Sequence, residues 1–308
     1  MPRHSRDTNT VPLENSHAPF FLLGPTAVGK SALAVEFAER VGGEIVGADA
    51  FQIYAGLDLL SAKPPPELRA RVSHHLIGEV PLTAAFDVAQ WLASARECIA
   101  AISARGRVPV VCGGTGLYIR ALTHGLAPLP GADATLRASL ESEPLPALVA
   151  RLIALDPAST VDMRNPRRVI RALEVCLLTG RPFSSFRTEW SGETAPRGFI
   201  LTRPRDELHA AIHARTDAMF AAGVIGEVAT AGEVGATAAQ MLGLAEIRAH
   251  LAGKITLVEC MEAIRQSTRQ YARRQLTWFR KERAFEWIDL SVTPDPLAIL
   301  VAPASKPA

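Results

Sequence analysis

The chain of 308 residues has a net charge of +2, with 48% hydrophobic and 21% charged residues. This balance is ordinary for a globular protein with a substantial core. The overall charge excludes any argument for a polyanionic partner, so a nucleic-acid surface would have to come from local clusters. No apolar run approaches the length of a membrane span, and we expect no membrane partner.

The four cysteines lie far apart and form no C-x-x-C pair, which predicts reduced thiols and a cytoplasmic protein. Residues 1–17 are polar and lack the apolar core of a signal peptide. We expect flexible tails at residues 1–18 and over the Pro- and Ala-rich residues 293–308. Nothing in the sequence demands a second subunit, so we expect a monomer.

A phosphate-binding loop follows the first predicted strand, the apolar run 20–23. Residues 24–31 match G-x-x-x-x-G-K-[ST] and lead into a helical pattern. The glycines let backbone amides converge on an anion at the positive end of that helix. Lys30 adds a positive charge, and the Ser31 hydroxyl can ligate magnesium. The predicted phosphate-binding residues are Gly24, Pro25, Thr26, Ala27, Val28, Gly29, Lys30 and Ser31.

The next segments alternate strand and helix patterns. Strands are expected over 43–49, 74–77 and 108–112, and a helix over 87–104. This alternation predicts an α/β fold, in which a P-loop NTPase-like parallel sheet is covered by helices on both faces. Ligands of such sheets gather at the carboxyl ends of the strands, so Asp49 and Thr115 are expected beside the phosphate loop.

From residue 124 to residue 197 the pattern changes to short helical pieces broken by proline and glycine. A strand pattern returns at 199–202, long helical patterns cover 205–227 and 256–283, and a last strand is expected near 285–288. We therefore expect a helical insertion, residues 124–197, between two parts of one core, residues 19–123 and 198–292.

The side chains at the strand ends each have two interpretations. Asp49 either caps a turn or acts as a general base opposite the phosphate site. The polar and aromatic residues that alternate over 49–54 favour the second role, because they suit a pocket for a planar base. Thr115 stands either in a plain glycine-rich turn or within reach of phosphate. The strand before Thr115 lacks the terminal carboxylate of nucleotide hydrolases, which favours group transfer.

His74 and His75 have no metal-ligating neighbours at suitable spacing, so we expect them to be structural.

Arginine is concentrated in two segments, 164–171 and 264–281. In the second, arginines at 265, 269 and 273 share one helical face, with few carboxylates and with Gln, Tyr and Trp between them. Such a helix is either a solvated face or an RNA surface; the charge imbalance and the use of arginine favour RNA.

Several of these segments resemble the tRNA dimethylallyltransferase family. The matching stretches are GPTAVGKS (24–31), GADAFQIY (47–54), GLDLLSAKP (56–64), SHHLI (73–77), GRVPVVCGGTGLYIRAL (106–122), RVIRALEV (168–175), residues 205–228 and QYARRQLTWFR (270–280). The resemblance implies magnesium-dependent transfer of a dimethylallyl group from dimethylallyl diphosphate to N6 of the adenosine next to the tRNA anticodon.

On this resemblance the phosphate loop would hold the donor diphosphate with Mg²⁺, and Ser31 would be the metal ligand. Asp49 would accept a proton from the adenine amine, and Thr115 would contact the diphosphate or the flipped nucleotide. The insertion would grip the anticodon stem-loop. The implied tRNA-binding residues are Asp49, Ala50, Phe51, Gln52, Thr115, Arg167, Arg168, Arg171, Gln240, Arg273, Arg274, Gln275 and Arg280.

Three positions depart from the family pattern. Ala50 stands where a serine usually follows the aspartate, Leu244 where a tyrosine is common, and residues 164–166 (Arg-Asn-Pro) where a Pro-Asn-Asp type sequence is usual.

Two other functions stay open. A P-loop kinase of a small metabolite or nucleotide would use Asp49 as its base, but the long arginine-rich helix is hard to explain with a small substrate. A non-catalytic RNA-binding module would not need an intact phosphate loop.

Overall fold

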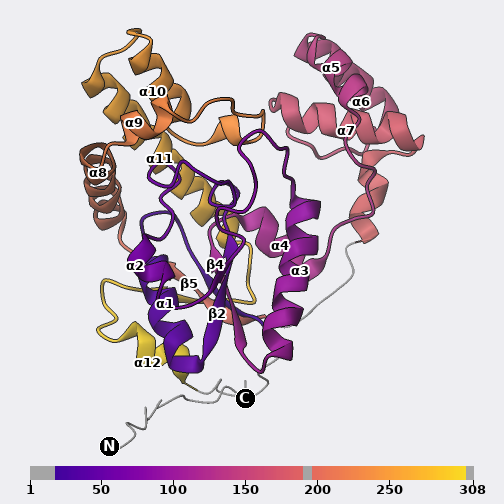
Figure 1. The fold of residues 1–308 in the computed structure, drawn as a ribbon. Helices are drawn as coiled ribbons and strands as arrows, with labels where there is room; N and C mark the ends of the chain where they lie inside the picture. Colours follow the sequence, from indigo (N-terminus) through magenta and orange to yellow (C-terminus); the bar gives the residue numbers. More distant parts are fainter. Residues whose placement is uncertain (1–17, 190–195, 303–308) are drawn as a thin grey trace, which may run out of the picture. The chain divides into compact units, whose positions relative to one another are not determined.

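The computed structural model describes residues 18–189 and 196–302. Six parallel strands form one sheet in the order β3-β2-β4-β1-β5-β6 (Figure 1). The strands are β1 (Phe20–Leu23), β2 (Gly43–Ala48), β3 (His74–His75), β4 (Val108–Gly113), β5 (Arg197–Thr202) and β6 (Glu286–Asp289). This sheet confirms the predicted α/β fold with a P-loop-like core.

Helices follow most strands, as parallel connections require. In the sheet-bearing part they are α1 (Lys30–Val41), α2 (Pro66–Arg69), α3 (Val88–Ala104), α4 (Gly116–His124), α8 (Arg205–Ala221), α9 (Val224–Ala229), α10 (Leu244–Leu251), α11 (Leu257–Phe279), α12 (Pro296–Val301) and the 3-10 turn η2 (Ala238–Gln240). The single helix expected over 205–227 is divided, because Gly223 takes φ 95° between α8 and α9.

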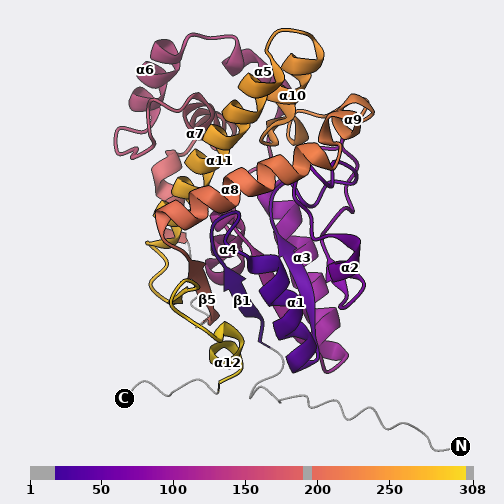
Figure 2. The same ribbon diagram turned by 90° about the vertical axis from the view of Figure 1, so that its left-hand side faces the viewer.

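The two faces of the sheet are covered by different helices. Alternate residues of β2 and β4, such as Ile45 and Val110, join a core with α1 and α12. On the other face Trp91 of α3 stacks on Tyr118 of α4 with ring centroids 4.4 Å apart, and its indole donates a 2.9 Å hydrogen bond to the Gly47 carbonyl. Helices α8 to α11 lie beyond the carboxyl ends of the strands (Figures 1 and 2). The sheet therefore presents the phosphate loop to these helices.

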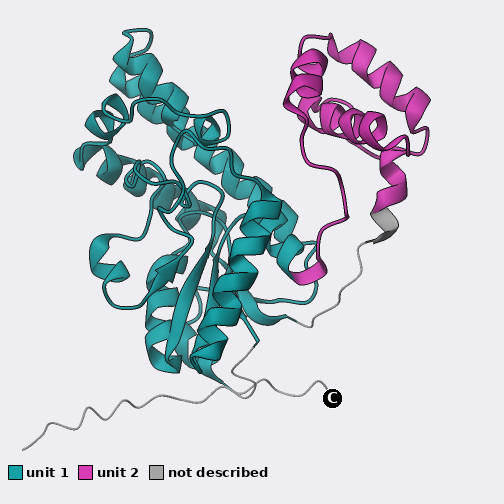
Figure 3. Cartoon of the chain, turned by 45° about the vertical axis from the view of Figure 1, so that its right-hand side comes forward, with its two compact units in different colours: residues 1–122, 195–308 teal, residues 123–194 magenta. Residues whose placement is uncertain are grey.

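The chain divides into two compact units, residues 1–122 with 195–308 and residues 123–194 (Figure 3). The second unit contains α5 (Ala134–Glu141), α6 (Leu145–Leu155), α7 (Pro166–Thr179) and the 3-10 helix η1 (Phe183–Glu189). Its own core includes Leu148, Leu152 and Leu173. The helix α7 begins where the Asn165 side chain accepts a hydrogen bond from the Arg168 amide, with a proline at its first turn.

The expected flexible tail over 293–308 is wrong for part of its length. Residues 296–301 form α12, with Asp295 as its N-cap, and Leu300 is only 1% exposed in the core beside α1. The Pro- and Ala-rich composition predicted mobility, but the apolar stretch after Pro296 has a core face to bury. The remaining parts of both expected tails, residues 1–17 and 303–308, lie outside the described residues.

Candidate functional site

The phosphate loop lies between β1 and α1, and its backbone has the curvature that an anion cradle needs. Gly24 has φ 150° and Gly29 φ 103°, and Ala27 between them has φ 65° although it is not glycine. Lys30 opens α1, so an anion in the loop would face the positive end of this helix. The Lys30 ammonium donates a 2.6 Å hydrogen bond to the Pro25 carbonyl within the loop itself.

The surroundings of Lys30 lower the pKa of its ammonium group. The pKa of Lys30 is lowered from 10.5 to about 8, chiefly by burial; Cys112 and the Asp49 carboxylate raise it, and the guanidinium of Arg215 lowers it. A bound diphosphate would favour the ammonium form, because an opposite charge stabilises the charged state of a lysine. An anionic ligand bound in the phosphate loop would therefore keep Lys30 protonated.

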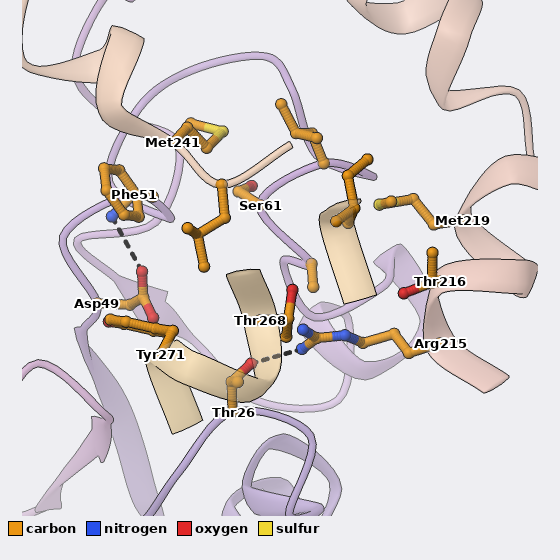
Figure 4. A pocket seen from close by; sticks show the side chains of 14 residues that line it. Thr26, Asp49, Phe51, Ser61, Arg215, Thr216, Met219, Met241, Thr268 and Tyr271 are labelled. Carbon is orange, nitrogen blue, oxygen red and sulfur yellow. Dashed lines mark hydrogen bonds between the residues drawn. The ribbon is translucent and has the colours of Figure 1, made fainter. Parts of the chain in front are cut away.

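Asp49 lies directly after β2, and its Oδ1 accepts a 2.9 Å hydrogen bond from the Phe51 amide (Figure 4). It also accepts a 3.3 Å bond from the Gln52 amide. This is the turn-capping geometry that the sequence offered as one interpretation. Within the described part of the chain, Oδ2 accepts no hydrogen bond. Asp49 therefore fixes its own turn with one oxygen and keeps the other for a ligand, so the two interpretations are compatible.

Thr115 follows β4, the neighbour of β2 in the sheet, and the structure brings it to Asp49. The Thr115 hydroxyl accepts a 3.0 Å hydrogen bond from the Ala50 amide, and the Thr115 amide donates to the Ala48 carbonyl at 3.2 Å. These bonds join the loops that follow the two strands. Gln52, on the same loop, donates from its amide nitrogen to the Ala62 carbonyl at 2.8 Å, which fixes the opposite wall of the site.

Close packing explains the glycines around Thr115. A Cβ on Gly114 would lie 2.2 Å from the side-chain nitrogen of Gln275, and a Cβ on Gly116 would lie 2.3 Å from the Trp278 ring. Both partners belong to α11. The glycine-rich sequence is therefore required for the approach of this helix to the loop, whatever the loop binds.

Gln275 was expected to contact tRNA, and the structure places it in the lining of the larger cavity with its side chain bonded within the protein. Its side chain is only 5% exposed, and it accepts a 2.8 Å hydrogen bond from the Thr26 amide and donates a 2.9 Å bond to the Gly114 carbonyl. Both ends of the amide are therefore used inside the protein. The tRNA contact of Gln275 stays a prediction, whereas the structure shows a positioning role for this side chain that the spacing of an arginine-rich helix does not indicate.

Two further residues of the site were not predicted individually. Arg215 of α8 donates a 2.7 Å hydrogen bond from Nη1 to the Thr26 hydroxyl in the phosphate loop (Figure 4). Tyr271 of α11 lies beside Asp49 in the same view. Burial raises the pKa of the Tyr271 phenol above its ordinary value, the Asp49 charge adds to this, and hydrogen bonding to Thr115 opposes it. Arg215 stands in a helix rich in both signs of charge, so no local pattern singled it out.

Two cavities meet at this site. The larger, about 370 Å³, is lined by phosphate-loop residues with Asp49, Gln52, Cys112 and Arg215. The smaller, about 60 Å³, continues past Asp49 and Arg215 between α8 and α11, and its lining becomes apolar. They share the residues Thr26, Asp49, Ser61, Ala62 and Arg215. A polar phosphate site therefore opens onto an apolar recess beside a carboxylate.

Ser31 lines the larger cavity at the start of α1 together with Lys30 and Asp49. In the described residues no group of three or more His, Cys, Asp or Glu side chains could hold a metal by itself. This donor set fits magnesium carried in by a diphosphate, because Mg²⁺ keeps few protein ligands and bridges phosphate oxygens. It does not fit a metal held by protein side chains alone.

Most of the other residues expected at a tRNA surface are exposed. In the sheet-bearing unit Arg273, Arg274 and Arg280 project from α11 or its end, and Gln240 is exposed on η2. Ala50 and Phe51 instead lie at the site, half-buried beside Asp49. In the other unit, Arg167 and Arg168 are exposed on the first turn of α7, whereas Arg171 binds the buried Glu174 at 2.8 Å and the Pro130 carbonyl at 2.6 Å.

Two of the three arginines expected on one face of α11 are paired with other side chains in the structure. Arg265 pairs with Asp217 of α8, and Arg269 bonds to Glu262 at 2.8 Å and to the His213 ring at 2.7 Å. These carboxylates lie outside the arginine-rich stretch 264–281, Asp217 on another helix and Glu262 seven residues before Arg269. Arg273 keeps the exposed position that the spacing predicted.

Fold and site together define a P-loop α/β protein whose phosphate site opens onto a carboxylate and an apolar recess. Residues 52–282 match the family described as IPP transferase. The chain is 43% identical to a tRNA dimethylallyltransferase of Geobacter sulfurreducens, over 90% of this chain and 93% of that protein. It is 46% identical to one of Anaeromyxobacter dehalogenans, over 89% and 96%. The chain therefore belongs to the IPP transferase family.

Solved structures agree with this assignment. The tRNA isopentenylpyrophosphate transferase from Bacillus halodurans is 34% identical with a TM-score of 0.69, covering 92% of this chain and 94% of that one. A eukaryotic dimethylallyltransferase matches the fold with a TM-score of 0.77 at 24% identity, covering 92% of this chain and 76% of that one. In the two described ranges, no helix is long and apolar enough to cross a membrane.

Proposed function

We propose that the phosphate loop binds the diphosphate of dimethylallyl diphosphate and that Asp49 receives the amine of a tRNA adenosine on the other side of the reacting carbon. The observation that carries this proposal is the meeting of the two cavities at Thr26, Asp49 and Arg215. A diphosphate on the loop would direct its organic group into the recess past Asp49. Donor and acceptor would therefore meet at the carboxylate.

The chain is a tRNA prenyltransferase, the activity named for its relatives at 43% and 46% identity. The alternative of a P-loop kinase of a small metabolite has no support from these relatives. The finer assignment, a dimethylallyl group placed on N6 of the adenosine 3′ to the anticodon, follows the same names and the chemistry of the site. A carboxylate beside a phosphate loop suits an amine nucleophile that must lose a proton.

The transfer forms one bond and breaks another. The adenine N6 bonds to C1 of the dimethylallyl group as the bond between C1 and the diphosphate oxygen breaks. The electron pair leaves with the diphosphate, and the N6 proton passes to the free Oδ2 of Asp49. Backbone amides of the loop, Lys30 and Arg215 would face the place where negative charge grows, and such preorganised groups stabilise a transition state strongly.

Magnesium belongs to this proposal as the ion that would accompany the diphosphate. The Ser31 hydroxyl is the protein group at the start of α1 that would hold it, with phosphate oxygens and water as the other ligands. The ion would neutralise charge on the leaving diphosphate. The protein residues themselves orient the donor and exclude water from the recess.

The tRNA would be held by arginines outside the cavity. Arg273, Arg274 and Arg280 extend from the same helix whose Tyr271 and Gln275 face the site, so phosphate contacts there would align the RNA with Asp49. Arg167 and Arg168 of the unit formed by residues 123–194 would grip the anticodon stem-loop, and Gln240 and Gln52 would contact the target nucleotide. We further propose a cytoplasmic monomer, in keeping with four free cysteines.

A donor comparison tests the proposed function. The protein is incubated with Mg²⁺, unmodified tRNA transcript and either labelled dimethylallyl diphosphate or labelled ATP. Label is expected to enter tRNA only from the prenyl donor, and digestion to nucleosides is expected to place it on N6 of adenosine. Consumption of ATP without prenylation of tRNA would contradict the proposal.

A further inference from the structure

The smaller cavity has a polar entrance and an apolar end (Figure 4). Thr26, Asp49 and Arg215 stand at the entrance, which it shares with the phosphate-loop cavity. Met219 and Met241 lie on the far side in the close view. The residues that close the far end are Leu60, Met219, Met241, Leu242 and Ile264.

The end is closed by the core of the protein. Leu60, Met241 and Ile264 are buried members of the apolar cluster beneath α9 and α10. Two hydroxyls of the lining are used by their own segments, that of Thr216 in a 2.9 Å hydrogen bond to the Ile212 carbonyl and that of Ser61 in a 2.7 Å bond to the Leu57 carbonyl. The far end therefore offers packing surface and no obvious partner for the polar edge of a base.

Helix α8 lines the smaller cavity, the recess, from its entrance to its far end. Arg215 contacts the phosphate loop at one end, and Met219 follows one turn later at the other. Four residues of α-helix rise about 6 Å, so the distance from the phosphate end to the methionine is short. The cavity of about 60 Å³ is small, and it gains room at its entrance, where it shares five lining residues with the larger cavity. A small branched hydrocarbon suits this space better than a purine or a ten-carbon chain.

We propose that this recess seats the hydrocarbon tail of the prenyl donor and that its apolar end, above all Met219, limits the donor to five carbons. The inference rests on the proposed function and goes further by naming the residues that select the donor. A longer donor such as geranyl diphosphate would react by the same exchange, with its N6–C1 bond replacing C1–O. It is rejected because its tail has no room beyond Met219.

The test compares donors in variants of the full chain. Met219→Ala enlarges the far end and Leu242→Ala does so from another side, and each keeps the entrance intact. Met261→Ala is the matched control, since Met261 lies on α11 but does not line the cavity. For each protein, kcat/KM is measured with dimethylallyl and with geranyl diphosphate at saturating tRNA, and folding is checked by circular dichroism.

The native protein and Met261→Ala are expected to discriminate strongly against geranyl diphosphate. Met219→Ala is expected to raise the relative kcat/KM for geranyl diphosphate at least about tenfold, the lower end of what one methylene is worth in a tight apolar pocket. Should Met219→Ala not fold, Leu242→Ala is expected to show the same direction.

Three outcomes would overturn the inference while leaving the proposed function standing. These are native use of both donors alike, an unchanged donor ratio in the folded Met219→Ala variant, or an unchanged donor ratio in the folded Leu242→Ala variant where Met219→Ala does not fold. A native protein that uses neither donor would instead overturn the proposed function, and the two failures are thereby distinguished.

Discussion

Gln275 and Thr26, which are 249 positions apart in the sequence, are joined by a 2.8 Å hydrogen bond from the Thr26 amide to the Gln275 side chain. The other end of the same side chain donates to the Gly114 carbonyl at 2.9 Å. One buried amide therefore joins α11 to the phosphate loop and to the loop before Thr115. The helix that carries the exposed arginines also positions the groups that surround the donor.

We expect Gln275→Leu to weaken both the fold and donor binding. Leucine has a similar size but leaves the Thr26 amide and the Gly114 carbonyl without this partner, which costs about 1–3 kcal/mol for each buried group. Urea unfolding should show the loss of stability, and the KM for the donor should rise. Gln266→Leu, at an exposed position of the same helix, is the control. Equal behaviour of the two variants would contradict the structural role of Gln275.

Asp49→Asn should remove the proton acceptor and keep the turn. The asparagine oxygen can still accept from the amides of Phe51 and Gln52, so folding and tRNA binding should not change. The rate of transfer at saturating substrates should fall by about 10²–10⁴-fold, the usual contribution of a general base. Asp87→Asn, which keeps an N-cap on α3 outside the site, serves as the control. Full activity of Asp49→Asn would refute the assignment.

Donor binding should weaken as pH rises past the pKa of Lys30. This pKa is about 8 in the free protein, so the binding ammonium is present below that pH and lost above it. Affinity for inorganic diphosphate with Mg²⁺, measured by calorimetry from about pH 6.5 to about pH 9.5, should fall by up to tenfold per unit above about pH 8. Lys30→Arg stays charged over this range and corrects for titration of the ligand. Parallel pH profiles for the two proteins would exclude this role of Lys30.

Arg273→Ala should reduce the salt dependence of tRNA binding more than Arg269→Ala. Arg273 is exposed on α11, whereas the Arg269 guanidinium already bonds to Glu262 and His213. Loss of one phosphate contact lowers the slope of log K against log salt by about 1. Filter binding of tRNA at several salt concentrations measures both slopes. If neither slope changes, α11 presents a solvated face and not an RNA surface.

The sequence predicted the sheet and the phosphate loop well because their signals are local. The motif of residues 24–31 and the apolar strand 108–112 each have a local pattern, and the rule for parallel sheets gathers the residues that follow such strands at their carboxyl ends. The juxtaposition of Asp49 and Thr115 followed from the same rule, and the Ala50–Thr115 hydrogen bond is in keeping with it. The sequence contains no such local signal for the order in which these strands and the later strands pair in the sheet.

The contacts that sequence could not predict are long-range. Arg215 reaches the phosphate loop from α8, and helical periodicity does not say which charged residue of a helix turns inwards. Gln275 was expected to face RNA for the same reason. The pairing of Arg265 with Asp217 depends on how α8 packs against α11, so the spacing of arginines alone predicted more free charge than the fold provides.

A crystal structure with Mg²⁺ and the unreactive thiolo analogue of dimethylallyl diphosphate tests the central claim most directly. The account predicts the diphosphate on the amides of residues 24–31, with Ser31 at the metal and C1 facing the side of the site that holds Asp49. An amine hydrogen-bonded to Oδ2 should then come within about 3–3.5 Å of C1. An empty phosphate loop, or a C1 turned away from Asp49, would contradict the account.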